Sequence, residues 1–247
     1  MPSRPQRSRS GGRLPLRPRP YNPLEMGELA RSVEGALLDT EPQRLDYVPN
    51  FFGAGIYVLY YHGPHYLYEP IAGTATPIYV GKAVQRGARK ARNDASVVGN
   101  ELWDRLDEHR ESVAWATDLD PADFHVRYLV TEELFIPLAE RLMIRSFTPM
   151  WNVVVDGFGN HDPGGGRYNQ RVSPWDTLHP GRPWVPRLTK SCKYSFEQIL
   201  GMIDTHFASP QVAVEVILPP AAPEPLSLFD LPDQDDDDVD EMVSGDR

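Results

Sequence analysis

Six side chains of the types that catalyse hydrolysis lie in separate parts of the chain: Tyr57, Tyr79, Arg105, His109, Glu140 and Asn152. Arg105 and His109 are four residues apart, so they share one face if their segment is helical. Glu140 interrupts the apolar run LFIPLAERLMI, where a carboxylate is costly unless it meets a partner or a cation. Phosphodiester hydrolysis uses a carboxylate for a hard cation, an arginine fork for phosphate oxygens, and a tyrosine or histidine for water.

Both tyrosines lie in short runs that are typical of strands, GIYVLYY and TPIYVGKA, which are rich in β-branched and aromatic residues. They belong to the tripeptides Gly55-Ile56-Tyr57 and Tyr79-Val80-Gly81. Adjacent strands of a hairpin can project two tyrosines from one face into a small volume. Taken alone, the pair is also compatible with ordinary core packing.

Helix-capping residues, hydrophobic periodicity and helix-breaking residues predict the other elements. A capping box at 22–25 begins a first helix, and Ser195 with Gln198 begins the last one. Between them the pattern predicts a hairpin over 51–81 with a long joining loop, a helix at about 99–111, a strand at 123–130 and a helix at about 137–146. This order predicts an α+β fold with a small antiparallel three-stranded sheet flanked by helices.

The two ends of the chain differ in charge. Residues 1–20 hold six Arg and no acid, whereas residues 224–247 hold ten acids and one Arg. We therefore expect a disordered basic arm at 1–20, a folded domain at 21–208 and a flexible acidic tail at 209–247.

The composition indicates the cellular compartment in which the protein is expected to work. No apolar run approaches the roughly 20 residues that a membrane-spanning helix needs, so no membrane partner is expected. Cys192 is the single cysteine, which excludes an intrachain disulfide and favours the cytoplasm.

The net charge of −10 at first argues against a nucleic-acid partner, but binding requires only a local positive surface. Residues 82–92 (KAVQRGARKAR) hold five cations and no acid, and residues 167–193 hold six cations against one acid. These two segments could supply such a surface, although any single Lys or Arg could also be a solvated side chain.

The order and intervals of the six residues resemble those of the GIY-YIG nuclease superfamily, with Val80 where Ile is usual. The Arg-x-x-x-His pair and the GFG…HPGR segment are most similar to its type II restriction endonuclease branch, in particular the homodimeric enzymes that cut CCGCGG. The resemblance covers roughly residues 22–207. It implies a site-specific, metal-dependent endonuclease that acts on double-stranded DNA, and the long hairpin loop is a departure from minimal family members.

The resemblance also implies roles for the acidic and basic residues. Glu140 would bind Mg²⁺, for which Mn²⁺ can substitute, and Arg105 would contact the scissile phosphate. Lys82 would help the metal to lower the pKa of Tyr57. Asn152 would position Glu140 or the phosphate.

The general base is left open between two residues. The resemblance puts Tyr57 beside the attacking water, but a phenol with a pKa near 10 is a poor base unless cations lower it. His109 could instead take the proton, either from Tyr57 or from the water. Tyr79 would orient the water or the phosphate.

DNA recognition is expected from the Gly/Pro-rich loop at about 156–187, because arginine to guanine is the commonest base contact. Arg167 or Arg171 would read bases. The full set of expected DNA contacts is Arg86, Arg89, Lys90, His161, Arg167, Asn169, Gln170, Arg171 and Arg182, with the first three on phosphates.

A palindromic target implies a two-fold dimer, and a restriction enzyme implies a DNA methyltransferase that protects the host. The first helix and the long hairpin loop are candidates for the dimer interface. A repair or homing nuclease of the same superfamily and a non-catalytic DNA-binding module are the alternatives. The segment Pro225-Leu226-Ser227-Leu228-Phe229 resembles a peptide that docks in the bacterial sliding clamp, without its leading Gln.

Overall fold

The computed structural model describes residues 26–85 and 99–209, all of which lie in the first of the two units into which the chain divides, Met1–Val212 and Ala213–Arg247. The expected basic arm at 1–20, the tail from 210 onward and the candidate contacts Arg86, Arg89 and Lys90 fall outside the described residues. Among those described, no helix is both long enough and apolar enough to cross a membrane.

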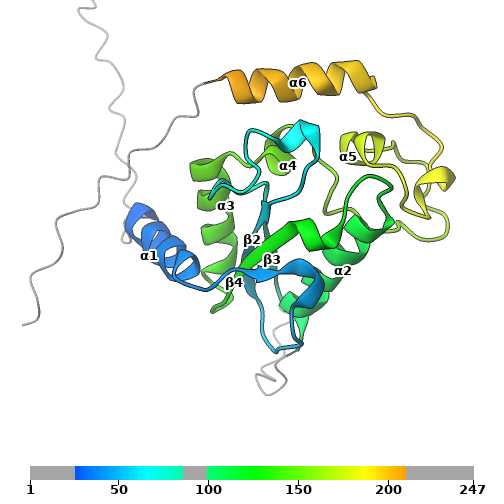
Figure 1. Cartoon of the computed structure of the whole chain (residues 1–247). Coiled ribbons are helices and arrows are strands. Elements are labelled where there is room, and N and C mark those ends of the chain that lie inside the picture. The colour runs from blue at the N-terminus through cyan, green and yellow to red at the C-terminus, as the bar shows by residue number, and fades with distance from the viewer. Residues whose placement is uncertain (1–25, 86–98, 210–247) are drawn as a thin grey trace, which may run out of the picture. The chain divides into compact units, whose positions relative to one another are not determined.

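The elements follow the predicted order (Figure 1). They are α1 (Met26–Leu38), β1 (Gln43–Arg44), η1 (Leu45–Tyr47), β2 (Gly55–Tyr61), η2 (Tyr66–Tyr68), β3 (Tyr79–Ala83), α2 (Glu101–Trp115), η3 (Pro121–Asp123), β4 (Phe124–Val130), α3 (Ile136–Phe147), α4 (Met150–Val153), α5 (Pro174–Leu178), η4 (Val185–Arg187) and α6 (Phe196–Ala208). The capping box that begins α6 is confirmed, since Ser195 and Gln198 each accept a hydrogen bond from the other's backbone N–H.

The α+β class is confirmed, but the described sheet has four antiparallel strands rather than three, in the order β1-β4-β2-β3. The additional strand, β1, consists only of Gln43 and Arg44, which pair with Val126 and His125 of β4. Two residues are too few to produce an alternating pattern, so this strand could not be predicted from periodicity. β2 lies in the centre, and β3 forms an edge.

Helices cover both faces of the sheet, so β2 is buried along its whole length. Ile56, Val58 and Tyr60 face α1 and α3, where they pack with Leu37, Ile136, Ala139 and Met143. The alternate residues Tyr57, Leu59 and Tyr61 face α2 and pack with Leu102, Leu106 and Val113. In Figure 1, α1 and α3 lie together on one side of the strands and α2 lies on the other.

Asn152 holds the edge strand β3 in place. Its side-chain amide donates to the carbonyl of Val80 and accepts from the N–H of Val80, each at 2.8 Å. This pairing satisfies backbone groups that β3, as an edge strand, would otherwise leave without a strand partner. Asn152 therefore acts on the strand that carries Tyr79.

The glycines of the two tripeptides leave room for neighbouring atoms. A Cβ added at Gly81 would lie 2.2 Å from the hydroxyl oxygen of Tyr57, and one added at Gly55 would lie 2.0 Å from the carbonyl oxygen of Leu129. Tyr57 pairs with Gly81 across the β2–β3 ladder, so its ring can lie over the glycine only because a side chain is missing there.

We expect Gly81→Ala to destabilise the protein by about 1–3 kcal/mol, the usual cost of forcing extra atoms into a packed core. Gly35→Ala is the matched control: nothing lies within 4 Å of its added Cβ, and alanine favours the interior of α1 by about 0.5–1 kcal/mol. Urea unfolding of the two variants measures both changes. Equal midpoints for Gly81→Ala and the wild type would show that Tyr57 does not depend on this space.

Candidate active site

A buried hydrogen bond between Tyr57 and His109 forms the centre of the site. β2 supplies the tyrosine and α2 supplies the histidine, and the Tyr57 Oη lies 2.5 Å from Nε2 of His109. Tyr57 is 0% exposed and His109 is 1% exposed. A buried hydroxyl needs a partner, and His109 provides one from the next layer of the fold.

The second tyrosine joins this pair as predicted. Tyr79 lies opposite Leu59 and Tyr57 lies opposite Gly81, so the two tyrosines are diagonal neighbours on the same face of the hairpin. Their ring centroids are 6.2 Å apart. Phe158, from the Gly/Pro-rich loop, stacks on His109 at 4.3 Å and meets the ring of Tyr79 edge-on at 5.0 Å.

Arg105 lies one helical turn before His109 and is held by the same loop. Its Nη2 donates to the carbonyl oxygen of Gly159 at 3.0 Å, and its Nη1 donates to Glu108 at 3.0 Å. Nη1 also contacts Nε2 of His161. A cleft of about 160 Å³ opens beside Arg105 and His161, so this guanidinium is accessible from solvent.

The electrostatics keep both members of the central pair neutral. Burial raises the pKa of Tyr57 well above its ordinary value, and the positive charge of Arg105 offsets only part of this effect. Burial, followed by the charge of Arg105, lowers the pKa of His109 well below its ordinary value. A neutral phenol and a neutral imidazole share one proton along their bond, so we assign Tyr57 as the donor and Nε2 of His109 as the acceptor.

Lys82 and Glu140 lie on the opposite face of the edge strand. Because side chains alternate along β3, Lys82 points away from Tyr79 toward α3, where its Nζ meets Oε2 of Glu140 at 2.5 Å. Arg105 is the cation that partly offsets the raised pKa of Tyr57 in this structure. The role of Lys82 together with a bound metal stays a prediction. The Glu140 charge still raises the pKa of both Tyr57 and Tyr79, so the carboxylate lies within electrostatic range of the tyrosines.

Glu140 fits a hard divalent cation. A carboxylate oxygen is the donor type that Mg²⁺ prefers, and the Glu140 side chain is 21% exposed, which leaves the site open to metal-bound water. The partner that neutralises it in this structure is Lys82. Asn152, by contrast, uses both amide atoms on the backbone of Val80.

One predicted DNA contact needs correction. Arg182 has a side chain without exposed surface: it pairs with Asp176 at 3.2 Å, donates to the carbonyl oxygens of Gly157 and Phe158, and lies 4.1 Å over the ring of Trp175. Burial lowers its pKa to about 10, so it remains charged at neutral pH. Arg182 anchors the loop from inside and cannot reach a DNA base in this structure.

The other described candidates for DNA contact are exposed on the same loop: His161, Arg167, Asn169, Gln170 and Arg171. Arg171 donates to the carbonyl oxygen of Ser191 at 3.2 Å, and Asn169 accepts from Thr189. Their contacts with DNA remain predictions. The sequence did not indicate that His161 would also contact Arg105, the residue one helical turn before His109.

Sequence reasoning missed two further features. Phe158 and Gly159 complete the site around His109 and Arg105, and only their place in the GFG motif hinted at a role. A separate cluster joins His65, Asp118 and His179, which are too far apart in the chain for any spacing signal.

Comparison with known proteins places the chain in a family. Residues 49–207 match the family described as the Eco29kI GIY-YIG domain. No curated protein matched the chain. The matched span contains all six residues first singled out and the loop that holds Arg105. The chain therefore belongs to the Eco29kI family of restriction endonucleases within the GIY-YIG superfamily.

Proposed function

We propose that this protein is a type II restriction endonuclease that hydrolyses double-stranded DNA at a short GC-rich palindrome, of which CCGCGG is the first candidate. The observation that carries the proposal is the buried Tyr57–His109 pair with Arg105 beside it, in a chain of this family. The proposed setting is the cytoplasm. The proposed assembly is a homodimer, since each site cuts one strand of a palindrome.

The proposed mechanism assigns one task to each group. Mg²⁺ held by Glu140, with Mn²⁺ as a substitute, would supply charge neutralisation at the phosphate and at the leaving oxygen. Arg105 offers donors to the phosphoryl oxygens, and it would have to exchange contacts with the loop for contacts with the phosphate. Tyr79, with its ring set by Phe158 and His109, orients the water or the phosphate.

The proposed proton transfer uses the hydrogen bond between Tyr57 and His109. As Tyr57 accepts a proton from the attacking water, it passes its own proton along the 2.5 Å contact to Nε2 of His109. The raised pKa of Tyr57 disfavours a free phenolate, so the two transfers are expected to be concerted. In this scheme the phenol, which is fully buried in this structure, must be uncovered to contact the water, and His109 is the final acceptor. Asn152 is a positioning residue that holds β3.

The residues proposed to contact DNA bases are those whose side chains are exposed on the Gly/Pro-rich loop. Arg167, Asn169, Gln170 and Arg171 are the candidates for base edges, with His161 at the boundary between recognition and catalysis. Arg86, Arg89 and Lys90 remain the proposed phosphate contacts. A methyltransferase that modifies the same site is the proposed partner of the system.

The pH dependence of cleavage tests the role of His109. Because the pKa of His109 is lowered, its imidazole stays neutral, and can accept a proton, at pH values below the ordinary histidine pKa of about 6.5. The acid limb of kcat/KM should therefore lie below pH 6.5, where protonation blocks transfer from Tyr57. His109→Ala should lower kcat by about 10²–10⁴-fold, the usual scale of general base catalysis, and remove that limb.

His206→Asn is the matched control for the pH profile, since burial also lowers the pKa of this histidine on α6. It should leave the profile unchanged. A His109→Ala enzyme with full activity and the wild-type profile would remove His109 from the proton path.

Plasmid cleavage with Mg²⁺ tests the function as a whole. The wild type should produce discrete fragments whose mapped ends give the recognition site. Glu140→Gln should cut at least about a hundredfold more slowly, the scale of one lost contact to transition-state charge. Glu133→Gln, the same change at an exposed position upstream of α3, should cut normally.

Other cleavage patterns would contradict the proposal in recognisable ways. Nicking without fixed ends would indicate a repair-type nuclease of the superfamily. Binding to DNA without cleavage of unmethylated plasmids of varied sequence would indicate a non-catalytic module.

A further inference from the structure

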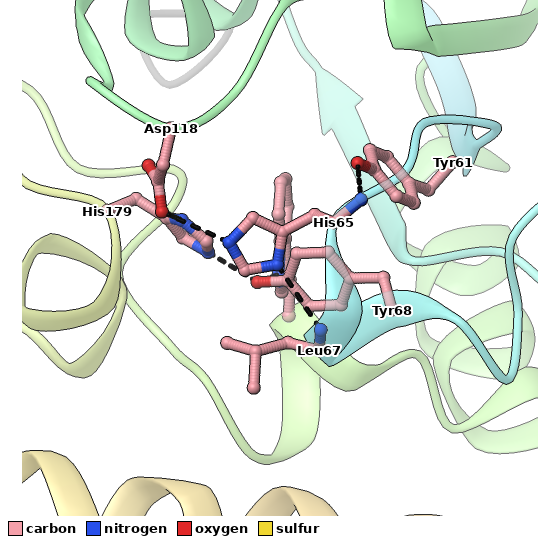
Figure 2. A network of polar contacts seen from close by, with 7 residues as sticks. Tyr61, His65, Leu67, Tyr68, Asp118 and His179 are labelled. Carbon is pink, nitrogen blue, oxygen red and sulfur yellow. Dashed lines mark hydrogen bonds and ion pairs between the residues drawn. The ribbon is translucent and has the colours of Figure 1, made fainter.

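A second polar cluster lies among loops and shares no residue with the proposed active site; its members are His65, Asp118 and His179 (Figure 2). His65 comes from the β2–β3 loop, Asp118 from the connection after α2, and His179 from the C-cap of α5. Nε2 of His65 lies 3.2 Å from Oδ2 of Asp118, and Nδ1 of His179 lies 2.9 Å from the same oxygen. One donor atom from each side chain falls within 4.8 Å of the other two.

The orientation of the His179 ring is fixed by a contact at Nε2, the ring nitrogen that does not face Asp118. Its Nε2 contacts the hydroxyl of Tyr68, which also accepts a hydrogen bond from Nε1 of Trp151 at 2.9 Å. His179 and Tyr68 are both fully buried. This fixed orientation directs Nδ1 of His179 toward Asp118, as hydrogen bonds behind a metal-ligating histidine do.

We propose that His65 Nε2, Asp118 Oδ2 and His179 Nδ1 form a binding site for one divalent transition-metal ion with the ligand preference of Zn²⁺. Two imidazoles and one carboxylate are a ligand set that zinc accepts. The site is built from residues other than Glu140 and does not depend on the proposed function.

The distances suit a tetrahedral ion. Zinc–nitrogen and zinc–oxygen bonds of about 2.0–2.2 Å place neighbouring ligand atoms about 3.3 Å apart. The two separations from the Asp118 oxygen, 3.2 and 2.9 Å, need changes of only a few tenths of an ångström, and the two nitrogens lie within 4.8 Å of each other. The side chains of His65 and Asp118 are 12% and 32% exposed, so a fourth ligand can be water.

Hydrogen bonding alone is the competing explanation. Without a metal, each imidazole N–H donates to Asp118, and Nδ1 of His65 accepts from the N–H of Leu67 at 3.3 Å. A metal on Nε2 of His65 puts the proton on Nδ1, so the Leu67 contact must be given up. It is the longest contact of the network. A metal on Nδ1 of His179 likewise puts the proton on Nε2, so the hydroxyl of Tyr68, which donates to Nε2 in the absence of a metal, would have to accept there instead.

The position of the site suggests what the metal does. It would link the β2–β3 loop, the α2–η3 connection and the Gly/Pro-rich loop, the last two of which are already joined by a hydrogen bond from the Thr117 N–H to the carbonyl oxygen of Pro180. The Gly/Pro-rich loop is the one that supplies Phe158 and Gly159 to the active site. The metal would thus have a structural role.

Titration of Co²⁺ into untagged, metal-stripped full-length protein, followed by visible absorption, tests the proposal. We expect one Co²⁺ per chain, displaced by Zn²⁺. Asp118→Asn keeps the volume and can still accept from both imidazoles, but it removes the anionic ligand. Asp118→Asn and His65→Ala should each weaken Co²⁺ affinity by at least about tenfold.

Two controls separate this site from others. His62→Ala removes an exposed imidazole from the same loop, and Glu140→Gln removes the proposed Mg²⁺ ligand; both should bind Co²⁺ as the wild type does. Zn²⁺ should raise the Tm of stripped wild-type protein but not that of Asp118→Asn. No saturable Co²⁺ site in the wild type, or an unchanged affinity in the folded Asp118→Asn variant, would overturn the proposal.

Discussion

The hydroxyl of Tyr57 is a polar group with no exposed surface, and the arrangement of the site follows from the need to pair it. Left unpaired, a buried hydroxyl costs about 1–3 kcal/mol. The fold meets this need with a neutral histidine from α2, and Gly81 leaves the space that the phenol occupies. The same burial raises the pKa of the tyrosine and lowers that of the histidine, so the chemistry proposed for Tyr57 depends on transfer of its proton to His109.

The Gly/Pro-rich loop contributes to the candidate active site and also carries the residues proposed to contact DNA. Arg182 fixes its first part from inside through Gly157 and Phe158, and the next residue, Gly159, accepts from Arg105. A DNA-induced shift of this loop would therefore change the position of the arginine proposed to contact the phosphate. Such a connection offers a physical route by which recognition can control cleavage.

The local patterns of the sequence were sufficient for much of the fold. Strand runs, caps and the four-residue interval of Arg105 and His109 predicted the hairpin, α2 and the convergence of the tyrosines, because these depend on neighbours along the chain. The burial of Arg182 and the pairing of Asn152 with Val80 depend on distant segments. The face of Lys82, by contrast, follows from the alternation of side chains along β3, because Lys82 comes three residues after Tyr79. A polar residue in a loop carries no sign of whether tertiary packing will cover it, so exposure was assumed for Arg182 and disproved by its pairing with Asp176.

Removing a single oxygen atom tests the account most directly. Tyr57→Phe keeps the ring over Gly81 and deletes only the hydroxyl, while Tyr60→Phe makes the same change on the opposite face of β2. In single-turnover cleavage of plasmid DNA with Mg²⁺, Tyr57→Phe should bind DNA like the wild type but cut at least about a hundredfold more slowly, and Tyr60→Phe should cut normally. Wild-type cleavage by a folded Tyr57→Phe enzyme would show that the buried Tyr57–His109 pair is structural and that the proton path lies elsewhere.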